Sequence, residues 1–360
     1  MDDLSKTTAA FYITDVGSLE ALQPLFEHFN AIIFADPHGQ AYKRMDREQT
    51  TPLSRADGLS QIFTDLPPDI LVTGTTPHQL ANGHYGREAS LWDLARAYDV
   101  PSVALWDKWD PTEVNSRLEI VAGSTPTPEA TGNYTAPDVL LMPSNHATVE
   151  LTGLITELSL SEFPKLVSTG NPRHDLLKAR KETELFSLPV NNIPVLLSSE
   201  NYMVEHGTSN VTLLSWLTAE SLNVFHWLVC YHPKDTAETV DAYRETLGDR
   251  GEIVDRDRYD TSHIVRCTPR FVVGTNSTLL EDAIIQGIPA LSIQPGFDGD
   301  VCDLSRQGVI PRATTPAHMG AALELYSQGS KFVPSMEKYR EDIDGGATAR
   351  VLDEISCLNT

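Results

Sequence analysis

Long hydrophobic runs are missing from this chain. It has no stretch of 18 consecutive apolar residues, and its start, MDDLSKTT, lacks the basic and apolar regions of a secretory signal peptide. The sequence therefore predicts a cytoplasmic protein without a transmembrane segment. Cysteine is also scarce, and its spacing fits neither a metal site nor a redox motif, so we expect reduced thiols at Cys230, Cys267, Cys302 and Cys357.

Positive charge is low as well. Lys and Arg total 27 against 50 Asp and Glu, which gives a formal net charge of −23 over 360 residues. Nucleic acids and anionic membranes are bound through basic patches, so this composition argues against both as partners. A single nucleotide needs only a local binding site, so the acidic composition does not exclude a nucleotide as a ligand. An acidic solvated surface is the favoured interpretation, with a salt-adapted source as the alternative.

Several catalytic motifs are absent. There is no serine nucleophile elbow, no Walker-type phosphate loop and no G-x-G-x-x-G fingerprint. Two D-x-D spacings occur, at residues 255–257 and 298–300, but such matches are expected by chance in so acidic a chain. We therefore predict no metal site and no resident cofactor.

What is present is an alternation of strands and helices, long enough for two α/β domains. We predict strands at 9–14, 31–35, 69–73, 102–106, 138–142, 165–168, 195–198, 224–231, 252–254, 263–266, 271–273 and 290–293. Predicted helices cover 19–29, 85–98, 147–158, 178–186, 209–221, 236–247, 279–286, 315–327 and 334–358. Asp235 is the predicted cap of the helix at 236–247. Residues 37–56 are predicted to form a surface loop. The fold class is α/β, with two doubly wound Rossmann-like domains facing across a cleft. Their predicted ranges are 1–187 and 188–332, with a linker at 188–194 and a final helix in 333–360.

The most informative stretch is FVVGTNSTLLEDAIIQGIPALSIQPG, residues 271–296. Its pattern predicts a strand, a turn of small hydroxyl residues, a helix that Gly287 and Pro289 end, and a second strand. Thr278 and Glu281 have the spacing of a capping box. The free N–H groups and positive dipole end of such a helix suit a phosphate, and Glu281 could hydrogen-bond a ribose. A plain turn with a helix cap is the alternative interpretation. The nucleotide-binding candidates in this turn are Thr275, Asn276, Ser277, Thr278 and Glu281.

Two more polar turns follow strands of the second domain. His232-Pro233-Lys234 comes after one strand, and Ser199-Glu200-Asn201 after another. Because parallel sheets bind ligands at the carboxyl ends of their strands, Ser199, His232 and Lys234 join the candidate nucleotide site. Solvated turns are the alternative.

The first domain offers carboxylates near strand ends. Asp15, Glu88 and Asp107 are our candidates for a general base. Asp107 lies between Trp106 and Trp109, which could form a flat wall for a sugar or base. The alternatives are that Asp15 only forms a turn, that Glu88 is a surface carboxylate stabilised by the dipole of its helix, and that the tryptophans lie in the core.

These segments together resemble GT-B type glycosyltransferases and their relatives. The resemblance rests on residues 274–295 (GTNSTLLEDAIIQGIPALSIQP), His232-Pro233, Thr169–Pro172 (TGNP) and residues 69–75 (DILVTGT). It implies that Glu281 contacts a ribose and that Ser277 and Thr278 meet a diphosphate. It also implies that the final helix packs back on the first domain.

The implied activity is metal-independent transfer of a sugar from a nucleotide-sugar to an acceptor hydroxyl, in bacterial surface polysaccharide or glycoconjugate synthesis. The second domain would bind the donor, and the first the acceptor. Non-hydrolysing UDP-N-acetylglucosamine 2-epimerases are a related alternative, but their H-R-x-E-N turn is Ser198-Ser199-Glu200-Asn201 here, and their G-D-T turn is Gly74-Thr75-Thr76. A catalytically silent nucleotide-binding protein is the third possibility. Oligomeric state is not indicated.

Overall fold

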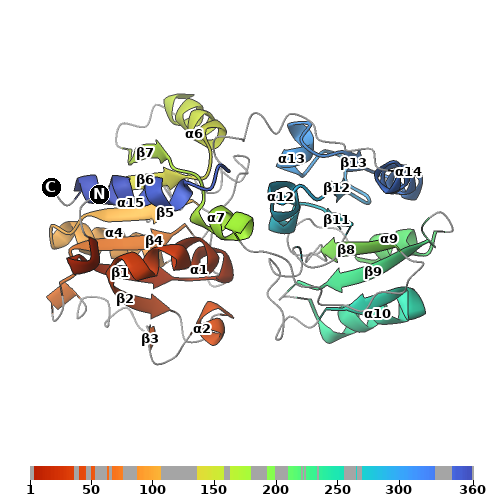
Figure 1. The fold of residues 1–360 in the computed structure, drawn as a ribbon, viewed down its shortest axis with the longest axis horizontal. Coiled ribbons are helices and arrows are strands. Elements are labelled where there is room, and N and C mark those ends of the chain that lie inside the picture. Colours follow the sequence, from red (N-terminus) through yellow and green to blue (C-terminus); the bar gives the residue numbers. More distant parts are fainter. Residues whose placement is uncertain are drawn as a thin grey trace, which may run out of the picture. The chain divides into compact units, whose positions relative to one another are not determined.

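The computed structural model divides into two compact units. Unit 1 comprises Met1–Leu176 with Lys338–Thr360, and unit 2 comprises Leu177–Glu337 (Figure 1). The residues described are 4–35, 40–45, 50–52, 63–64, 67–75, 87–106, 136–157, 163–179, 193–198, 210–219, 222, 224–232, 235–254, 265, 270–328 and 343–358. The boundaries predicted at 187/188 and 332/333 lie outside these ranges and stay predictions.

Unit 1 is built on a seven-stranded sheet in which every neighbouring pair is parallel. Its strands are β1 (Thr8–Ile13), β2 (Asn30–Ala35), β3 (Thr50–Pro52), β4 (Ile70–Gly74), β5 (Ser102–Leu105), β6 (Val139–Met142) and β7 (Lys165–Ser168). The order β3-β2-β1-β4-β5-β6-β7 runs outward in both directions from β1, so the topology switches between β1 and β4. Ligands of open α/β sheets bind at such a point, beside the carboxyl ends of the strands.

Helices cover both faces of this sheet, which explains the continuous apolar runs of its strands. The helices of unit 1 are η1 (Leu4–Lys6), α1 (Val16–Leu22), η2 (Gln23–His28), α2 (Gln40–Arg44), α4 (Arg87–Ala97), α6 (Asn145–Glu157) and α15 (Ala347–Leu358), and α7 (Pro172–Ala179) crosses its boundary with unit 2. One core cluster joins the sheet to α1, η2 and α15, and the other joins it to α4 and α6.

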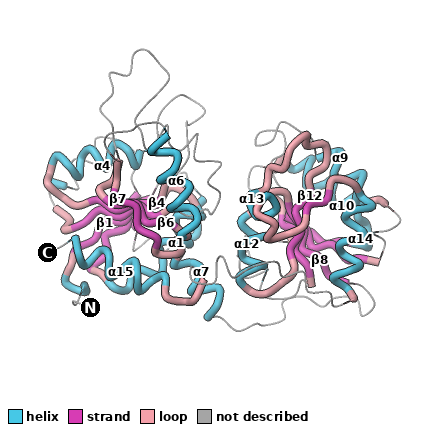
Figure 2. Tube along the Cα trace, turned by 90° about the horizontal axis from the view of Figure 1, so that it is seen from above, coloured by secondary structure: helices cyan, strands magenta, loops and turns pink. Residues whose placement is uncertain are grey.

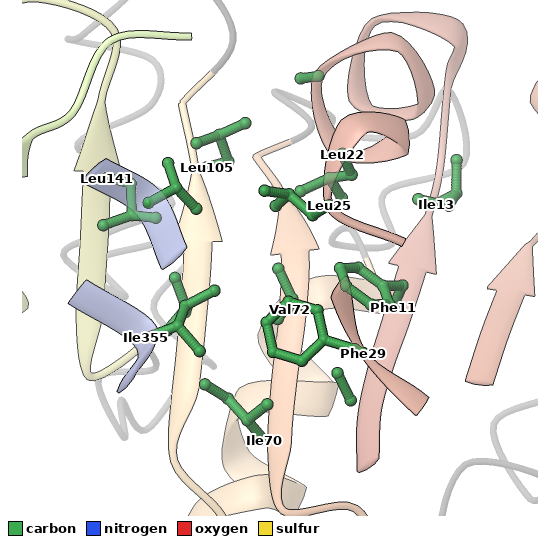
Figure 3. Close-up of a cluster of buried hydrophobic side chains, with 14 of the residues drawn as sticks. Phe11, Ile13, Leu22, Leu25, Phe29, Ile70, Val72, Leu105, Leu141 and Ile355 are labelled. Atoms are coloured by element: carbon green, nitrogen blue, oxygen red, sulfur yellow. The ribbon is translucent and has the colours of Figure 1, made fainter. Parts of the chain in front are cut away.

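The last helix, α15, belongs to the core of unit 1 although it comes at the end of the chain. Its buried Val351, Leu352 and Ile355 join the apolar cluster of the sheet, and Figure 3 shows Ile355 beside Leu141 and Leu105. The apolar side of α15 therefore packs on the face of this sheet that α1 and η2 also cover.

Polar contacts fix the start of α15. The carboxylate of Asp175, in α7, accepts the N–H groups of Ala347 (3.2 Å) and Thr348 (2.7 Å). Arg350 Nε donates to the carbonyl of Thr169 at 2.8 Å. The carboxylate of Asp175 and the carbonyl of Thr169 thus hold the C-terminal helix on unit 1.

Unit 2 carries a six-stranded parallel sheet in the order β10-β9-β8-β11-β12-β13. The strands are β8 (Ile193–Ser198), β9 (Phe225–Cys230), β10 (Gly251–Ile253), β11 (Phe271–Gly274), β12 (Ala290–Ile293) and β13 (Arg312–Ala313). The helices are α9 (Asn210–Leu217), α10 (Ala237–Leu247), η4 (Gly248–Arg250), α12 (Thr278–Ile285), α13 (Asp303–Arg306) and α14 (Pro316–Ser327). Figure 2 shows α9, α10 and α14 on one face and α12 on the other. The topology switches between β8 and β11.

The predicted α/β class with two doubly wound parallel sheets is confirmed. Some local predictions were wrong. The surface loop predicted at 37–56 contains α2 and the edge strand β3. The helix predicted at 19–29 ends as α1 at Leu22 and continues as the 3-10 helix η2, where Pro24 lies at its start.

Other helix bounds also differ. The helix α7, which proline suits at its first turn, covers Pro172–Ala179 and was not predicted before residue 178, while residues 180–186 of the helix predicted at 178–186 lie outside the described residues. The helix predicted at 334–358 starts at Ala347 as α15. The helix α10 is capped by Thr236 rather than Asp235. The strand predicted at 263–266 lies outside the described residues except for Val265. In the described part of the chain, no helix has both the length and the apolar character needed to cross a membrane.

Candidate functional site

The start of α12 lies at the switch point of unit 2. Ser198 ends β8, and its Oγ donates a hydrogen bond of 2.8 Å to Oγ of Ser277, the residue that caps α12. The same Oγ accepts the backbone N–H of Leu279 at 3.2 Å. Ser277 therefore has its hydroxyl proton left to donate, beside the N–H groups of the first helical turn. Those groups and the helix dipole make this position suited to an anion.

The capping box predicted for this helix was wrong by one residue. Ser277 has an extended backbone (φ −77°, ψ 143°) and is the cap, whereas Thr278 is already the first helical residue. Glu281 is then one position too far along to close a capping box. It is a largely buried residue, 7% exposed, and Asp282 beside it is fully buried. Carboxylates this close to the positive end of α12 favour the helix.

Thr275 has a structural role in the turn. It is fully buried, and its Oγ1 donates to the carbonyl of Ile293 at 2.7 Å. In return Ser292 Oγ donates to the carbonyl of Thr275 at 2.7 Å. These two bonds hold the turn before α12 against β12. Asn276, which follows, is partly exposed, and whether either residue contacts a ligand stays a prediction.

The other predicted residues of this site are more scattered. His232 follows β9, which lies on the far side of β8 from β11, so about 10 Å of sheet separates the ends of β9 and β11. The backbone N–H of His232 donates to Oδ2 of Asp235 at 2.8 Å, which fixes the turn. Ser199 and Lys234 lie outside the described residues.

The switch point of unit 1 brings two predicted carboxylates near one short segment. Thr14 follows β1, and its Oγ1 donates to Oε1 of Glu88 at 2.8 Å. Glu88 is only 2% exposed, in the first turn of α4. Asp15, the next residue after Thr14, uses Oδ1 to cap α1 by accepting the N–H of Ser18 at 2.8 Å. Asp107 lies outside the described residues.

The end of β4 packs closely against this segment. A Cβ at Gly74 would lie 2.5 Å from Cβ of Ser18, so only glycine allows α1 to approach. Thr73, the residue before it, accepts the indole N–H of Trp92 at 3.1 Å and so ties α4 to β4. The flat wall predicted for Trp106 was wrong, because this side chain is 1% exposed and belongs to the core under α4 and α6. Trp109 lies outside the described residues.

Sequence reasoning missed Thr14 and Ser198. Thr14 connects β1 to Glu88 at the switch point of unit 1, and Ser198 connects β8 to Ser277 at that of unit 2. Each is a small polar residue at the end of an apolar strand, which is the signal that could have identified them. Neither pattern says which residue across the sheet the hydroxyl reaches.

No metal centre is evident in the described part of the chain, where no group of three or more His, Cys, Asp or Glu side chains is placed to hold an ion. Asp300, in the second D-x-D spacing, is engaged by Gln294, Ser305 and the N–H of Cys302. Partial burial is the largest single effect and raises the pKa of its carboxyl, but these hydrogen bonds and the charge of Arg312 together lower the pKa below its usual value. Residues 255–257 lie outside the described residues. Metal independence stays a prediction.

The sequence matches no protein-family model and no curated protein. Its structure does resemble solved ones over nearly the whole length. The S. aureus MnaA–UDP structure aligns with a TM-score of 0.62 and 13% identity, covering 97% of this chain and 96% of that one. The UDP-GlcNAc 2-epimerase of Neisseria meningitidis bound to UDP-GlcNAc gives 0.60 and 11%, covering 97% and 99%.

A UDP-glucosyltransferase of Polygonum tinctorium that can glucosylate indoxyl gives a TM-score of 0.56 with 10% identity, and covers 99% of both chains. At these identities the comparison establishes the fold. The chain has the two-domain α/β fold that GT-B glycosyltransferases share with UDP-GlcNAc 2-epimerases, as the sequence resemblance predicted.

Proposed function

We propose that this chain is a nucleotide-sugar-dependent enzyme that transfers a sugar to an acceptor hydroxyl. The observation that carries the proposal is the Ser198–Ser277 hydrogen bond, which fixes the start of α12 at the switch point of unit 2. The diphosphate of a nucleotide-sugar matches the charge and the donors of that position. Structurally similar proteins that bind UDP or UDP-GlcNAc support a uridine nucleotide as the first ligand to test.

The roles proposed for the residues follow from leaving-group chemistry. When the bond from sugar to diphosphate breaks, negative charge develops on the departing phosphate oxygen. The positive end of the α12 dipole and the Ser277 hydroxyl would stabilise that charge without a metal ion, because they are already oriented. Glu281 would hydrogen-bond the ribose hydroxyls.

Glu88 is the general base that the geometry of unit 1 favours. The hydroxyl of Thr14 holds its carboxylate at the end of β1, at the switch point of that sheet. Asp15 is less suited, because its carboxylate caps α1. Asp107 remains a candidate from the sequence alone. A role in polysaccharide or glycoconjugate synthesis is the biological setting we propose.

Epimerisation of a UDP-sugar is the second candidate. The Neisseria enzyme, whose structure aligns with 97% of this chain, favours it. The turns after β4 and β8 weigh against it, because Gly74-Thr75 and Ser198-Ser199 stand where the epimerase pattern has acid/base residues. Epimerisation needs no acceptor, so incubation of UDP-GlcNAc with the enzyme alone separates the two activities.

Ligand binding is tested first, by thermal shift against UDP, GDP, CDP, CMP and their common sugar derivatives, since a ligand of the folded state raises its stability. For the nucleotide that binds, Ser277→Ala should weaken affinity by about 10- to 100-fold, the equivalent of losing a hydrogen bond to a charged group. The matched control is Thr236→Ala, which removes the cap of α10 at the same edge of the sheet.

Both variants should lose similar thermal stability, but only Ser277→Ala should lose affinity. If Ser277→Ala and the wild-type protein bind the nucleotide with equal affinity, the nucleotide does not bind at the start of α12. Binding without consumption of donor, with acceptors or without, would instead identify a nucleotide-binding protein that has no turnover.

A further inference from the structure

A buried polar network joins the turn before α12 to the loop that follows β12. Gln294, the residue after β12, is fully buried. Its Nε2 donates to Oγ of Ser292 at 2.9 Å and to Oδ1 of Asp300 at 2.6 Å, while its Oε1 accepts the N–H of Val301 at 3.1 Å. One amide therefore contacts both the strand and the loop.

The network continues from Ser292 to the turn. Ser292 Oγ accepts from Gln294 and donates to the carbonyl of Thr275, so the hydrogen bonds run in one direction from Gln294 to Thr275. Thr275 lies two residues before the cap Ser277. Ser292, Gln294 and Thr275 are all fully buried, where a hydrogen bond that is lost is not replaced by water.

The loop end of the network is equally well fixed. Asp300 Oδ1 accepts Ser305 Oγ at 2.5 Å and the N–H of Cys302 at 3.1 Å. Arg306 Nη1 donates to the carbonyl of Asp300 at 3.0 Å, and Arg312 donates to the carbonyl of Gly299. The loop is thus a rigid support to which Gln294 attaches the turn.

We propose that Gln294 is a positioning residue that sets the start of α12 for ligand binding, acting through Ser292 and Thr275. Without this connection, the turn and the capping residue would be held only by the Thr275–Ile293 hydrogen bond and by the contact with β8. Donors in an anion site must be held within a fraction of an ångström to be effective, so loosening the turn lowers affinity without removing a ligand contact. The proposal rests on the nucleotide site proposed for α12.

The test compares two serine substitutions in the full chain. Ser292→Ala breaks the connection between Gln294 and Thr275. Ser305→Ala removes the bonds of Ser305 Oγ to Asp300 and to the carbonyl of Cys302, together with a long one of 3.4 Å from Gln294 Nε2. It leaves the connection from Gln294 through Ser292 to Thr275 in place, and is the control. Affinity for UDP is measured by titration calorimetry, and amide exchange of residues 275–281 by mass spectrometry without ligand.

For Ser292→Ala we expect about a tenfold weaker affinity for UDP and about tenfold faster exchange in residues 275–281, which corresponds to the loss of one net hydrogen bond. Ser305→Ala should change neither beyond twofold. If both variants behave alike, the connection does not position the turn, and the proposal is wrong even though the nucleotide site stands.

Gln294→Glu provides a readout that loss of stability alone would not produce. When protonated, the new carboxyl can donate to Asp300 and accept from Val301, but its single O–H cannot also reach Ser292 as the amide does. When ionised, it donates to neither and also repels the Asp300 carboxylate. UDP affinity relative to wild type should therefore be lowered at about pH 5 and fall further towards pH 8. A flat ratio would contradict coupling between Gln294 and the turn.

If the wild-type protein binds no UDP, the uridine part of the proposed function fails. The exchange measurement then decides the positioning role. Faster exchange of residues 275–281 in Ser292→Ala alone supports it, and unchanged exchange overturns it.

Discussion

Replacing Gly74 with alanine gives a direct test of how unit 1 is packed at its switch point. The added Cβ would lie 2.5 Å from Cβ of Ser18, whereas non-bonded carbons prefer about 3.5–4.0 Å. One of the two elements must therefore move by about 1 Å. Ser18 cannot easily retreat, because its N–H and Oγ both bond to Asp15 at the start of α1.

We expect Gly74→Ala to lower the free energy of unfolding of unit 1 by about 1–3 kcal/mol, the usual cost of overpacking a well-packed site. Ser18→Gly removes the Cβ that would clash. On its own it should cost about 1 kcal/mol, because it adds a glycine to a helix and loses the hydroxyl that bonds the N–H of Asp15. In the double variant the clash is absent, so its loss should be smaller than the sum of the single losses.

The assay is amide exchange of β4 and α1 over a series of urea concentrations, which reports on unit 1 separately from unit 2. A coupling energy of about 1–2 kcal/mol between the two substitutions would support close contact. If the two losses add to within about 0.5 kcal/mol, Gly74 and Ser18 do not meet, and the reasoning is refuted.

Two further predictions concern the C-terminal helix and a buried histidine. Ile355→Ala should lower the free energy of unfolding of unit 1 by about 2–5 kcal/mol, because Ile355 is fully buried on the sheet. Asp353→Ala, on the exposed side of α15, should leave the amide exchange of unit 1 almost unchanged. Burial, with a smaller effect of Arg173, lowers the pKa of His174 to about 3 from 6.5. The unfolded state therefore binds more protons, and stability should fall by up to about 1.4 kcal/mol per pH unit as pH drops from 6.5 towards 3. His174→Gln should flatten that acid limb in urea titrations at several pH values, and an unchanged slope would contradict the assignment.

Local signals explain the parts of the fold that the sequence predicted well. The strand at 165–168 matches β7, and the strand at 290–293 matches β12, because short segments with apolar residues between turn signals identify strands without reference to the rest of the chain. Errors arose where two local signals compete. The start of α7 at Pro172 was not predicted, and Thr278 was preferred over Ser277 as a cap because both are good capping residues.

The candidate site was only partly accessible in the same way. The turn of hydroxyl residues before residues 279–286 was visible in the sequence, and so was the buried Glu88 as a titratable group near a strand end. The partners that give these groups their position were not visible. Ser198 and Ser277 are 79 residues apart, and Thr14 and Glu88 are 74 apart. Gln294 was not singled out, because a glutamine after a strand has no local signature of a network.

The sequence by itself therefore determined the alternation of strands and helices, the doubly wound class and the helix start suited to an anion, since each depends on neighbouring residues. Only the tertiary structure decided the strand order. That order places β8 beside β11 and β1 beside β4, and so creates the two switch points. It also decided that α15 completes the core of unit 1. An amphipathic helix requires an apolar surface to cover, but the choice of surface depends on packing between segments that are distant in the chain.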